Sequence, residues 1–133
     1  MIARELMKKP ITCSEEETIQ EAARLMADNQ IGSLIVTKAG RLRGILTERD
    51  IMIGLAEMGG DVAFAFVKDM MTESVFTVSP NAGVSSAVKL MEEHKIKKLP
   101  VVDGDQLVGI ITATDILERL PGKGAKLYEI LKG

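Results

Sequence analysis

The chain has 133 residues, which fits one compact domain or two small fused units and excludes a large multidomain enzyme. Hydrophobic residues make up 46% and charged residues 27%, so the chain can build a core and is not expected to be disordered. A formal net charge of −2 and an aromatic content of 3% disfavour nucleic-acid partners.

The sequence also indicates a cytoplasmic protein. No apolar run approaches the roughly 18–20 residues that cross a bilayer, and the first ten residues lack the apolar segment of a signal peptide. The single cysteine, Cys13, cannot form an intramolecular disulfide, which fits a reducing compartment. We therefore expect no membrane partner.

The sequence of residues 12–58 predicts a strand, a helix, a β-hairpin and a second helix, in this order. A short strand around Thr12 precedes a helix with apolar residues at helical spacing and a capping box of Thr18 and Glu21 at its start. A β-hairpin and a second helix come next. The predicted ranges are strands 34–37 and 42–46, and a helix from about residue 47 to residue 58.

The same order repeats at an offset of 65 residues, with Thr12 aligned to Thr77 and Ile51 aligned to Ile116. The first helix of the second repeat has a less well specified start, because Gly83 stands where the first copy has the capping Thr18. The fold class is therefore α/β with mixed sheets, built from two β-α-β-β-α repeats. We assign residues 1–60 to the first repeat, 61–120 to the second, and 121–133 to a tail with a short helix.

Residues 59–69 join the repeats, and their apolar side chains predict a packed helix. Each repeat alone would leave apolar surface in contact with water, because its helices cover one face of a small sheet. The two repeats are therefore expected to pack together.

One heptad closes the aligned block in both copies, Gly44–Asp50 and Gly109–Asp115. It places a glycine in the last strand and Thr-x-x-Asp at the start of the next helix. A helix start offers free N–H groups to a phosphate, and a nearby carboxylate can accept from two adjacent sugar hydroxyls. The pattern therefore favours a nucleotide site.

The heptad also has a purely structural interpretation, because Thr-x-x-Asp resembles a capping box. Its repetition favours function: Glu48-Arg49 differs from Ala113-Thr114, while the glycine, threonine and aspartate are the same in both copies. A cap alone could have become Ser or Glu in one of them.

Together these motifs resemble a tandem pair of CBS domains, also called a Bateman module. The resemblance rests on Thr12-x-Ser14 and Thr77-x-Ser79, the stretches 29–36 and 94–103, and the two Gly-h-h-Thr-x-x-Asp heptads, where h is hydrophobic. It covers roughly residues 3–120. It implies repeats packed with pseudo-twofold symmetry, and two clefts that bind AMP, ADP, ATP, S-adenosylmethionine or sometimes NAD(H).

The resemblance also implies roles for residues. Asp50 and Asp115 would accept from ribose, and Thr47 and Thr112 would contact phosphate or ribose. Backbone near the start of each repeat would line the adenine pockets, and two later stretches would form the cleft walls. The full implied set is Thr12, Cys13, Gly32, Ser33, Leu34, Ile35, Thr47, Arg49, Asp50, Thr77, Val78, Ile96, Lys97, Lys98, Pro100, Thr112, Thr114 and Asp115.

The two clefts are not expected to be equivalent. Lys97 and Lys98 replace Gly32-Ser33, and Pro100 replaces Ile35, so the cleft of Asp115 would favour a phosphorylated ligand. The cleft of Asp50 has only Arg49 nearby. In such modules one site usually combines both repeats, which would join Asp115 and Lys98 to Thr12 and Ser33.

We therefore expect a non-catalytic sensor that binds an adenine nucleotide or S-adenosylmethionine as a regulatory ligand, forms a homodimer and acts in trans on a protein effector. The alternative is a scaffold for dimerisation or partner docking with vestigial clefts. No acid–base or nucleophile constellation indicates an enzyme with a catalytic cofactor, and no metal site is expected.

Other chemistry-bearing residues have structural interpretations. His94 is expected at a helix end, and Cys13 as a small core residue, the alternative being a reactive thiol. Glu15–Glu17 should be a solvated helix start. Pro121–Lys126 lacks the pattern of a phosphate loop.

Overall fold

The computed structural model describes residues 1–132, which form two compact units. Residues Ile11–Val75 make up one, named here the Asp50 unit; Met1–Pro10 and the chain from Phe76 onward make up the other, the Asp115 unit. The segment before each sequence repeat thus packs with the other repeat: the first ten residues belong with Asp115, and residues 59–75 belong with Asp50.

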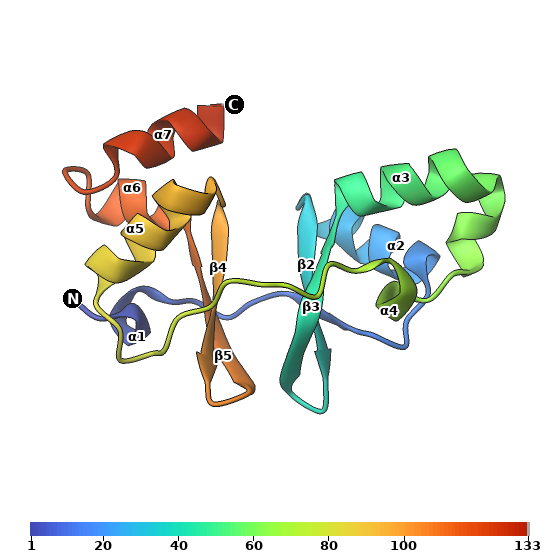
Figure 1. Ribbon diagram of the computed structural model, residues 1–133, viewed down its shortest axis with the longest axis horizontal. Helices are drawn as coiled ribbons and strands as arrows, with labels where there is room; N and C mark the ends of the chain where they lie inside the picture. Colours follow the sequence, from blue (N-terminus) through green and yellow to red (C-terminus); the bar gives the residue numbers. More distant parts are fainter. Residues whose placement is uncertain (133) are drawn as a thin grey trace. The chain divides into compact units, whose positions relative to one another are not determined.

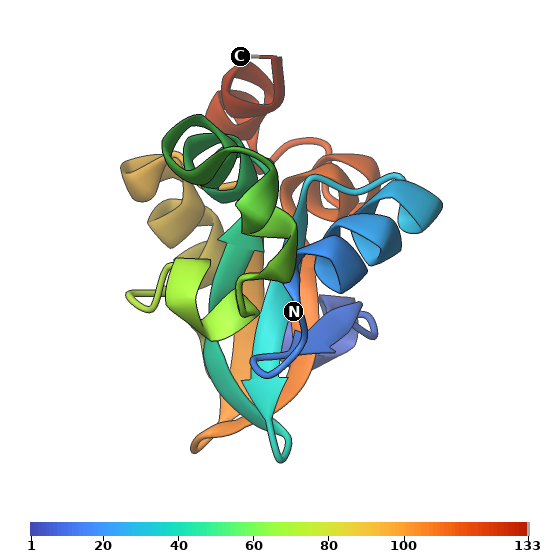
Figure 2. The ribbon, with the colours of Figure 1, turned by 90° about the vertical axis from the view of Figure 1, so that its right-hand side faces the viewer.

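The Asp50 unit is a three-stranded mixed sheet with helices packed against it (Figures 1 and 2). Strand β1 pairs in parallel with β2, and β2 pairs antiparallel with β3. Its elements are β1 (Thr12–Ser14), α2 (Ile19–Asn29), β2 (Ser33–Lys38), β3 (Arg41–Thr47), α3 (Glu48–Met58), the 3-10 helix η1 (Gly59–Phe64) and α4 (Val67–Met70). The expected joint helix is therefore two short helices.

The predicted capping box of α2 is present. The Thr18 hydroxyl accepts from the Glu21 amide at 3.2 Å, and the Glu21 carboxylate accepts from the Thr18 amide at 2.9 Å. The bond from the Thr18 amide, and a second one that the Thr18 hydroxyl donates to the same carboxylate at 3.0 Å, hold the pKa of the Glu21 carboxyl below its usual value. The apolar face of α2 supplies Ile19, Ala22 and Met26 to the core, as its spacing predicted.

The Asp115 unit repeats the hairpin and its two helices (Figure 1). Its elements are α1 (Ala3–Leu6), α5 (Val84–His94), β4 (Lys98–Asp103), β5 (Gln106–Thr112), α6 (Ala113–Arg119) and α7 (Ala125–Lys132). Helix α5 begins at Gly83 without a side-chain cap, as predicted. The predicted tail helix is α7, which packs on α5 and α6 and buries Leu127; Gly133, the last residue of the predicted tail, lies outside the described residues.

The first strand predicted for the second repeat is wrong in extent. Around Thr77 the structure has one parallel bridge, between Val78 and Val101. In the Asp50 unit the ladder continues because the Glu15 amide donates to the Thr37 carbonyl at 3.2 Å. Pro80 stands at the position of Glu15 and has no amide hydrogen, so the corresponding bond cannot form.

The prediction that Glu15 is solvated is also wrong. Its side chain is buried and accepts from Arg43 Nε at 2.7 Å. A buried carboxylate needs such a partner, and the second repeat lacks both residues of this ion pair, with Pro80 and Val108 in their places.

No helix in the described part of the chain is both long and apolar enough to cross a membrane.

Candidate nucleotide site

The glycine of each heptad lies where another segment crosses the strand. A Cβ at Gly44 would lie 2.6 Å from the Thr72 carbonyl oxygen, and one at Gly109 would lie 2.6 Å from Met7 Sδ. The crossing segments are fixed by pairs of backbone hydrogen bonds, between Ile45 and Thr72 at 2.9 and 2.8 Å and between Ile110 and Lys8 at 2.9 and 3.0 Å. Close backbone approach therefore explains the glycines.

At Asp50 the heptad forms a closed capping box. The Asp50 carboxylate accepts from the Thr47 amide at 2.9 Å, and the Thr47 hydroxyl accepts from the Asp50 amide at 3.1 Å. Both residues stabilise the start of α3. A sugar hydroxyl that bound this carboxylate would compete with the backbone bond.

At Asp115 only half of this arrangement is present. The Thr112 hydroxyl accepts from the Asp115 amide at 3.2 Å, but the described chain has no bond from the carboxylate to the Thr112 amide. Instead, Lys8 Nζ lies 3.1 Å from Oδ2 and 3.4 Å from Oδ1 of Asp115, and only the Oδ1 contact has hydrogen-bond geometry. Oδ2 is thus a buried acceptor without a hydrogen bond among the described residues.

The charge around the two heptads also differs. Lys98 is the register partner of Thr112 across the β4–β5 hairpin. Burial lowers the pKa of the Lys98 ammonium, and the positive charge of Lys8 lowers it further. At the corresponding place in the Asp50 unit, Ser33 pairs with Thr47, and the Glu48 carboxylate lies against Gly32. The Asp115 heptad is therefore flanked by two cations, whereas the Asp50 heptad contains a second acid, Glu48, and has the uncharged Ser33 in place of Lys98.

The predicted site residues divide between the two units. The Asp50 unit contains Thr12, Cys13, Gly32, Ser33, Leu34, Ile35, Thr47, Arg49 and Asp50. The Asp115 unit contains Thr77, Val78, Ile96, Lys97, Lys98, Pro100, Thr112, Thr114 and Asp115. The predicted joining of Asp115 and Lys98 to Thr12 and Ser33 stays a prediction.

Several of these side chains are buried. Cys13 and Leu34 lie in the core of the Asp50 unit, and Ile35 and Pro100 are also buried. A ligand at these four positions would therefore meet mainly backbone. Burial raises the pKa of the Cys13 thiol to about 12, and Glu17 adds to the shift, which makes Cys13 an unreactive small core residue.

Lys8 is the residue that sequence reasoning missed. The segments before the repeats correspond at an offset of 64, which aligns Lys8 with Thr72. That alignment places Lys8 at the position of Thr72, but only the crossing over β5 shows that Lys8 reaches the heptad.

His94 ends α5 as predicted, and its ring stacks on Phe76 with centroids 3.8 Å apart.

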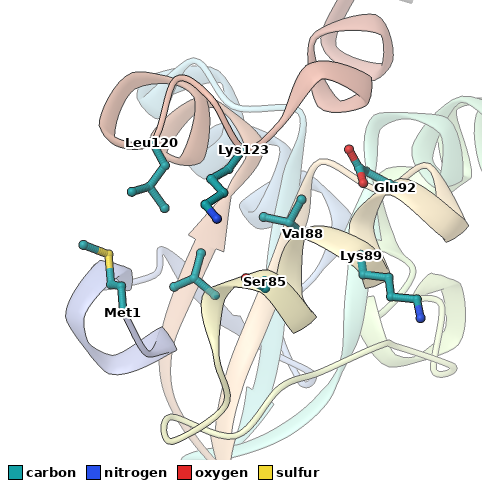
Figure 3. A pocket seen from close by; sticks show the side chains of 8 residues that line it. Met1, Ser85, Val88, Lys89, Glu92, Leu120 and Lys123 are labelled. Atoms are coloured by element: carbon teal, nitrogen blue, oxygen red, sulfur yellow. The ribbon is translucent and has the colours of Figure 1, made fainter.

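A separate pocket of about 290 Å³ lies between α1, α5 and the segment after α6 (Figure 3). Met1, Val84, Val88 and Leu120 give it apolar walls, with Lys89, Glu92 and Lys123 among its polar lining. It contains none of the residues predicted for the ligand.

Within residues 1–132, no group of three or more His, Cys, Asp or Glu side chains is arranged to hold a metal ion.

Comparison with known proteins agrees with this architecture. The chain matches the CBS domain family twice, over residues 3–57 and 67–122. Hypoxic response protein 1 of Mycobacterium tuberculosis is 38% identical over 121 residues, which cover 90% of this chain and 85% of that protein. A crystal structure of Hypoxic Response Protein I with two coordinated zinc ions superposes with a TM-score of 0.78 and 36% identity, over 90% of this chain and 99% of that one.

A second solved structure is informative about ligands. The CBS domain pair of protein MJ0100, in complex with 5′-methylthioadenosine and S-adenosyl-L-methionine, has a TM-score of 0.76 and 28% identity, over 92% of this chain and 98% of that one. The resemblance predicted from the repeated heptads is confirmed: the chain belongs to the CBS domain family and contains two CBS domains.

Proposed function

We propose that the protein is a non-catalytic sensor for an adenosine-containing ligand and that the Asp115 unit carries its principal site. The observation that supports this most is the open carboxylate: Asp115 Oδ2 is buried and accepts no hydrogen bond from residues 1–132, whereas the carboxylate of the equivalent Asp50 accepts from the Thr47 amide. Lys8 Nζ lies 3.1 Å from Asp115 Oδ2 as an ion pair without hydrogen-bond geometry. Two adjacent ribose hydroxyls would supply the hydrogen bonds that a buried acceptor needs.

The proposed roles follow from position. Asp115 accepts from the ribose hydroxyls, Thr112 keeps the start of α6 in place, and Lys98 attracts the phosphate. The adenosyl ligands of the MJ0100 domain pair support a purine nucleoside as the common element. Hydrogen bonds to a charged group contribute about 1.5–3 kcal/mol each, so burial of the adenine must supply the rest of a micromolar affinity.

The Asp50 heptad is proposed as a weaker second site. A ligand there must displace the bond between the Asp50 carboxylate and the Thr47 amide, and a helix cap is worth about 0.5–2 kcal/mol. Since about 1.4 kcal/mol corresponds to a tenfold change in affinity, this competition alone weakens binding several-fold.

Occupancy would be reported to an effector protein in trans by a shift between conformations, limited by the difference in the ligand's affinity for them. We infer that this occurs in the cytoplasm; the free, buried Cys13 agrees with a reducing compartment.

The test is calorimetry with ATP, ADP, AMP, S-adenosylmethionine and NADH on the wild type, Asp115→Ala and Asp50→Ala. We expect at least one compound to bind the wild type at micromolar concentration. Asp115→Ala should weaken the affinity for that compound at least tenfold, and Asp50→Ala should change the affinity of the tighter site less than threefold. Binding no tighter than millimolar for every compound would contradict the sensor, and unchanged affinity in Asp115→Ala would contradict the site.

The scaffold alternative is favoured by a different feature. An apolar groove of about 530 Å³ lies between α2 and α3, and Met52 and Leu55 on its wall are 60% and 55% exposed. This surface supports a homodimer through α2 and α3. Light scattering should show a dimer for the wild type. The double variant Met52→Glu/Leu55→Glu should be a monomer. The control Lys38→Glu, at an exposed hairpin position, should remain a dimer. A dimer that binds none of the five compounds more tightly than millimolar would favour the scaffold.

A further inference from the structure

We propose that Lys8 is a specificity residue of the Asp115 site: it pairs with Asp115 when no ligand is bound and contacts the phosphate of a nucleoside 5′-phosphate when one binds. This inference rests on the proposed function and deepens it, because it selects an anionic ligand over neutral or cationic adenosyl compounds.

The backbone of Lys8 is fixed in a position that the site requires. Its amide donates to the Ile110 carbonyl at 3.0 Å, and its carbonyl accepts from the Ile110 amide at 2.9 Å, so Lys8 crosses β5 two residues before Thr112. From this crossing the ammonium reaches Asp115 at 3.1 Å. Lys8 is therefore held at the heptad and is not part of a loose terminus.

The side chain of Lys8 is nevertheless free to change partner. It is 57% exposed, while the Asp115 side chain is only 19% exposed. An exposed ion pair contributes little to stability, so exchanging the carboxylate for a phosphate oxygen is inexpensive. An ammonium has three donors and binds a phosphate as a compact charge.

The local charges favour an anion. Lys8 and Lys98 together exceed the single negative charge of Asp115, and the lowered pKa of Lys98 reflects its burial near Lys8. When the Asp115 carboxylate accepts from ribose hydroxyls, its oxygens are occupied by the ligand and the Lys8 ammonium needs another acceptor. A phosphate restores the balance, a neutral nucleoside does not, and the sulfonium of S-adenosylmethionine adds a further positive charge.

The other repeat provides an internal control. Thr72 crosses β3 at Ile45 with the same pair of backbone bonds but has no charge, and Asp50 there closes onto Thr47. The unit with Lys8 at the crossing thus has the open carboxylate, and the unit with Thr72 at the crossing has the closed one. Substituting Lys8 by Thr places the crossing residue of the Asp50 unit in the Asp115 unit.

The experiment measures AMP and adenosine affinity by calorimetry for the wild type, Lys8→Thr, Lys8→Arg and the neighbouring control Lys9→Thr. We expect the wild type to bind AMP at least tenfold more tightly than adenosine. Lys8→Thr should weaken AMP about tenfold and change adenosine less than threefold. Lys8→Arg should retain the preference for AMP, and Lys9→Thr should match the wild type.

The outcomes separate the two proposals. If the wild type binds AMP and Lys8→Thr keeps the same ratio of AMP to adenosine affinity, the role of Lys8 is wrong and the sensor stands. If Lys8→Thr weakens both probes equally, Lys8 only supports the site and its role in specificity is wrong. If the wild type binds neither probe and none of the compounds tested above, the proposed function fails and this inference fails with it.

Discussion

Asp50 and Asp115 hold the same place in a repeated heptad, yet their carboxylates have different partners. Asp50 accepts from the Thr47 amide, and Asp115 pairs with Lys8. The heptads agree at the glycine, threonine and aspartate, but their surroundings differ: Lys8 crosses β5 where Thr72 crosses β3, and Lys98 stands where the other unit has Ser33. A repeated motif therefore defines a position, and residues outside it give that position different charged neighbours.

The helices of the two units differ in the same way. In the Asp115 unit α7 packs on α5 and α6, and Leu117 and Leu120 are only partly exposed. The equivalent residues of α3, Met52 and Leu55, are exposed because no described helix covers them. Helix α7 thus covers an apolar face in the Asp115 unit, and the corresponding face of α3 in the Asp50 unit is exposed.

The largest effect is expected from uncovering the closed face. Leu127→Ala removes a fully buried side chain from α7 and should lower the free energy of unfolding by about 2–5 kcal/mol. Met52→Ala, on the open face, should change it by less than about 0.5 kcal/mol. Urea unfolding followed by circular dichroism measures both at a concentration where the chain is monomeric. Equal losses would mean that the two faces are covered alike in solution.

A smaller effect is expected at the crossings. Gly44→Ala forces a Cβ against the Thr72 carbonyl, part of a paired backbone, whereas Gly109→Ala meets the flexible side chain of Met7. Overpacking costs about 1–3 kcal/mol, and we expect Gly44→Ala near the upper end and Gly109→Ala near the lower end. Thermal unfolding of the two variants gives the order. A larger loss in Gly109→Ala would show that Met7 cannot move.

The caps should separate the two aspartates. Asp50→Ala leaves the Thr47 amide without its acceptor and should cost about 1 kcal/mol. Asp115→Ala removes an ion pair with the exposed Lys8 and no bond to the Thr112 amide, and should cost between about 0 and 1 kcal/mol. Chemical denaturation without ligand tests this order. If Asp115→Ala is the more destabilising variant, its carboxylate supports the fold more than a ligand site would.

The sequence predicted most of the fold because each element carries a local signal. The apolar spacing of α2, its capping box and the two hairpins all lie within short windows and appear where expected. The failures came from long-range effects. The missing amide of Pro80 shortens a strand, and the burial of Glu15 depends on Arg43, which lies far along the chain.

The site was predictable to a similar degree. The heptads located both aspartates, but nothing in a heptad shows whether its carboxylate closes onto the backbone. The open carboxylate contacts Lys8, which lies more than a hundred residues from Asp115 and is brought to it by the crossing over β5. The burial of Cys13, by contrast, agrees with the alternation of side chains along β1, whereas β2 buries the consecutive residues Leu34, Ile35 and Val36.

The smallest effect at neutral pH is expected at Cys13, whose counterpart in the other repeat is Val78. Cys13→Val, which installs that residue, should change the stability at pH 7 by less than about 1 kcal/mol because the two side chains are similar in volume. In the wild type, iodoacetamide at pH 8 should label Cys13 only after unfolding, since the folded thiol is buried and protonated.

Alkaline pH should then separate Cys13 from Val. The folded state raises the pKa of the thiol from 9.0 to about 12, so between these values the unfolded chain loses the proton and the folded chain keeps it. Rising pH therefore favours unfolding, and stability that is complete below pH 9 is lost toward pH 12. Subtracting the urea midpoints of Cys13→Val from those of the wild type isolates this contribution from other titrating groups. A difference that stays constant with pH would mean that the thiol ionises as easily in the folded core as in the unfolded chain.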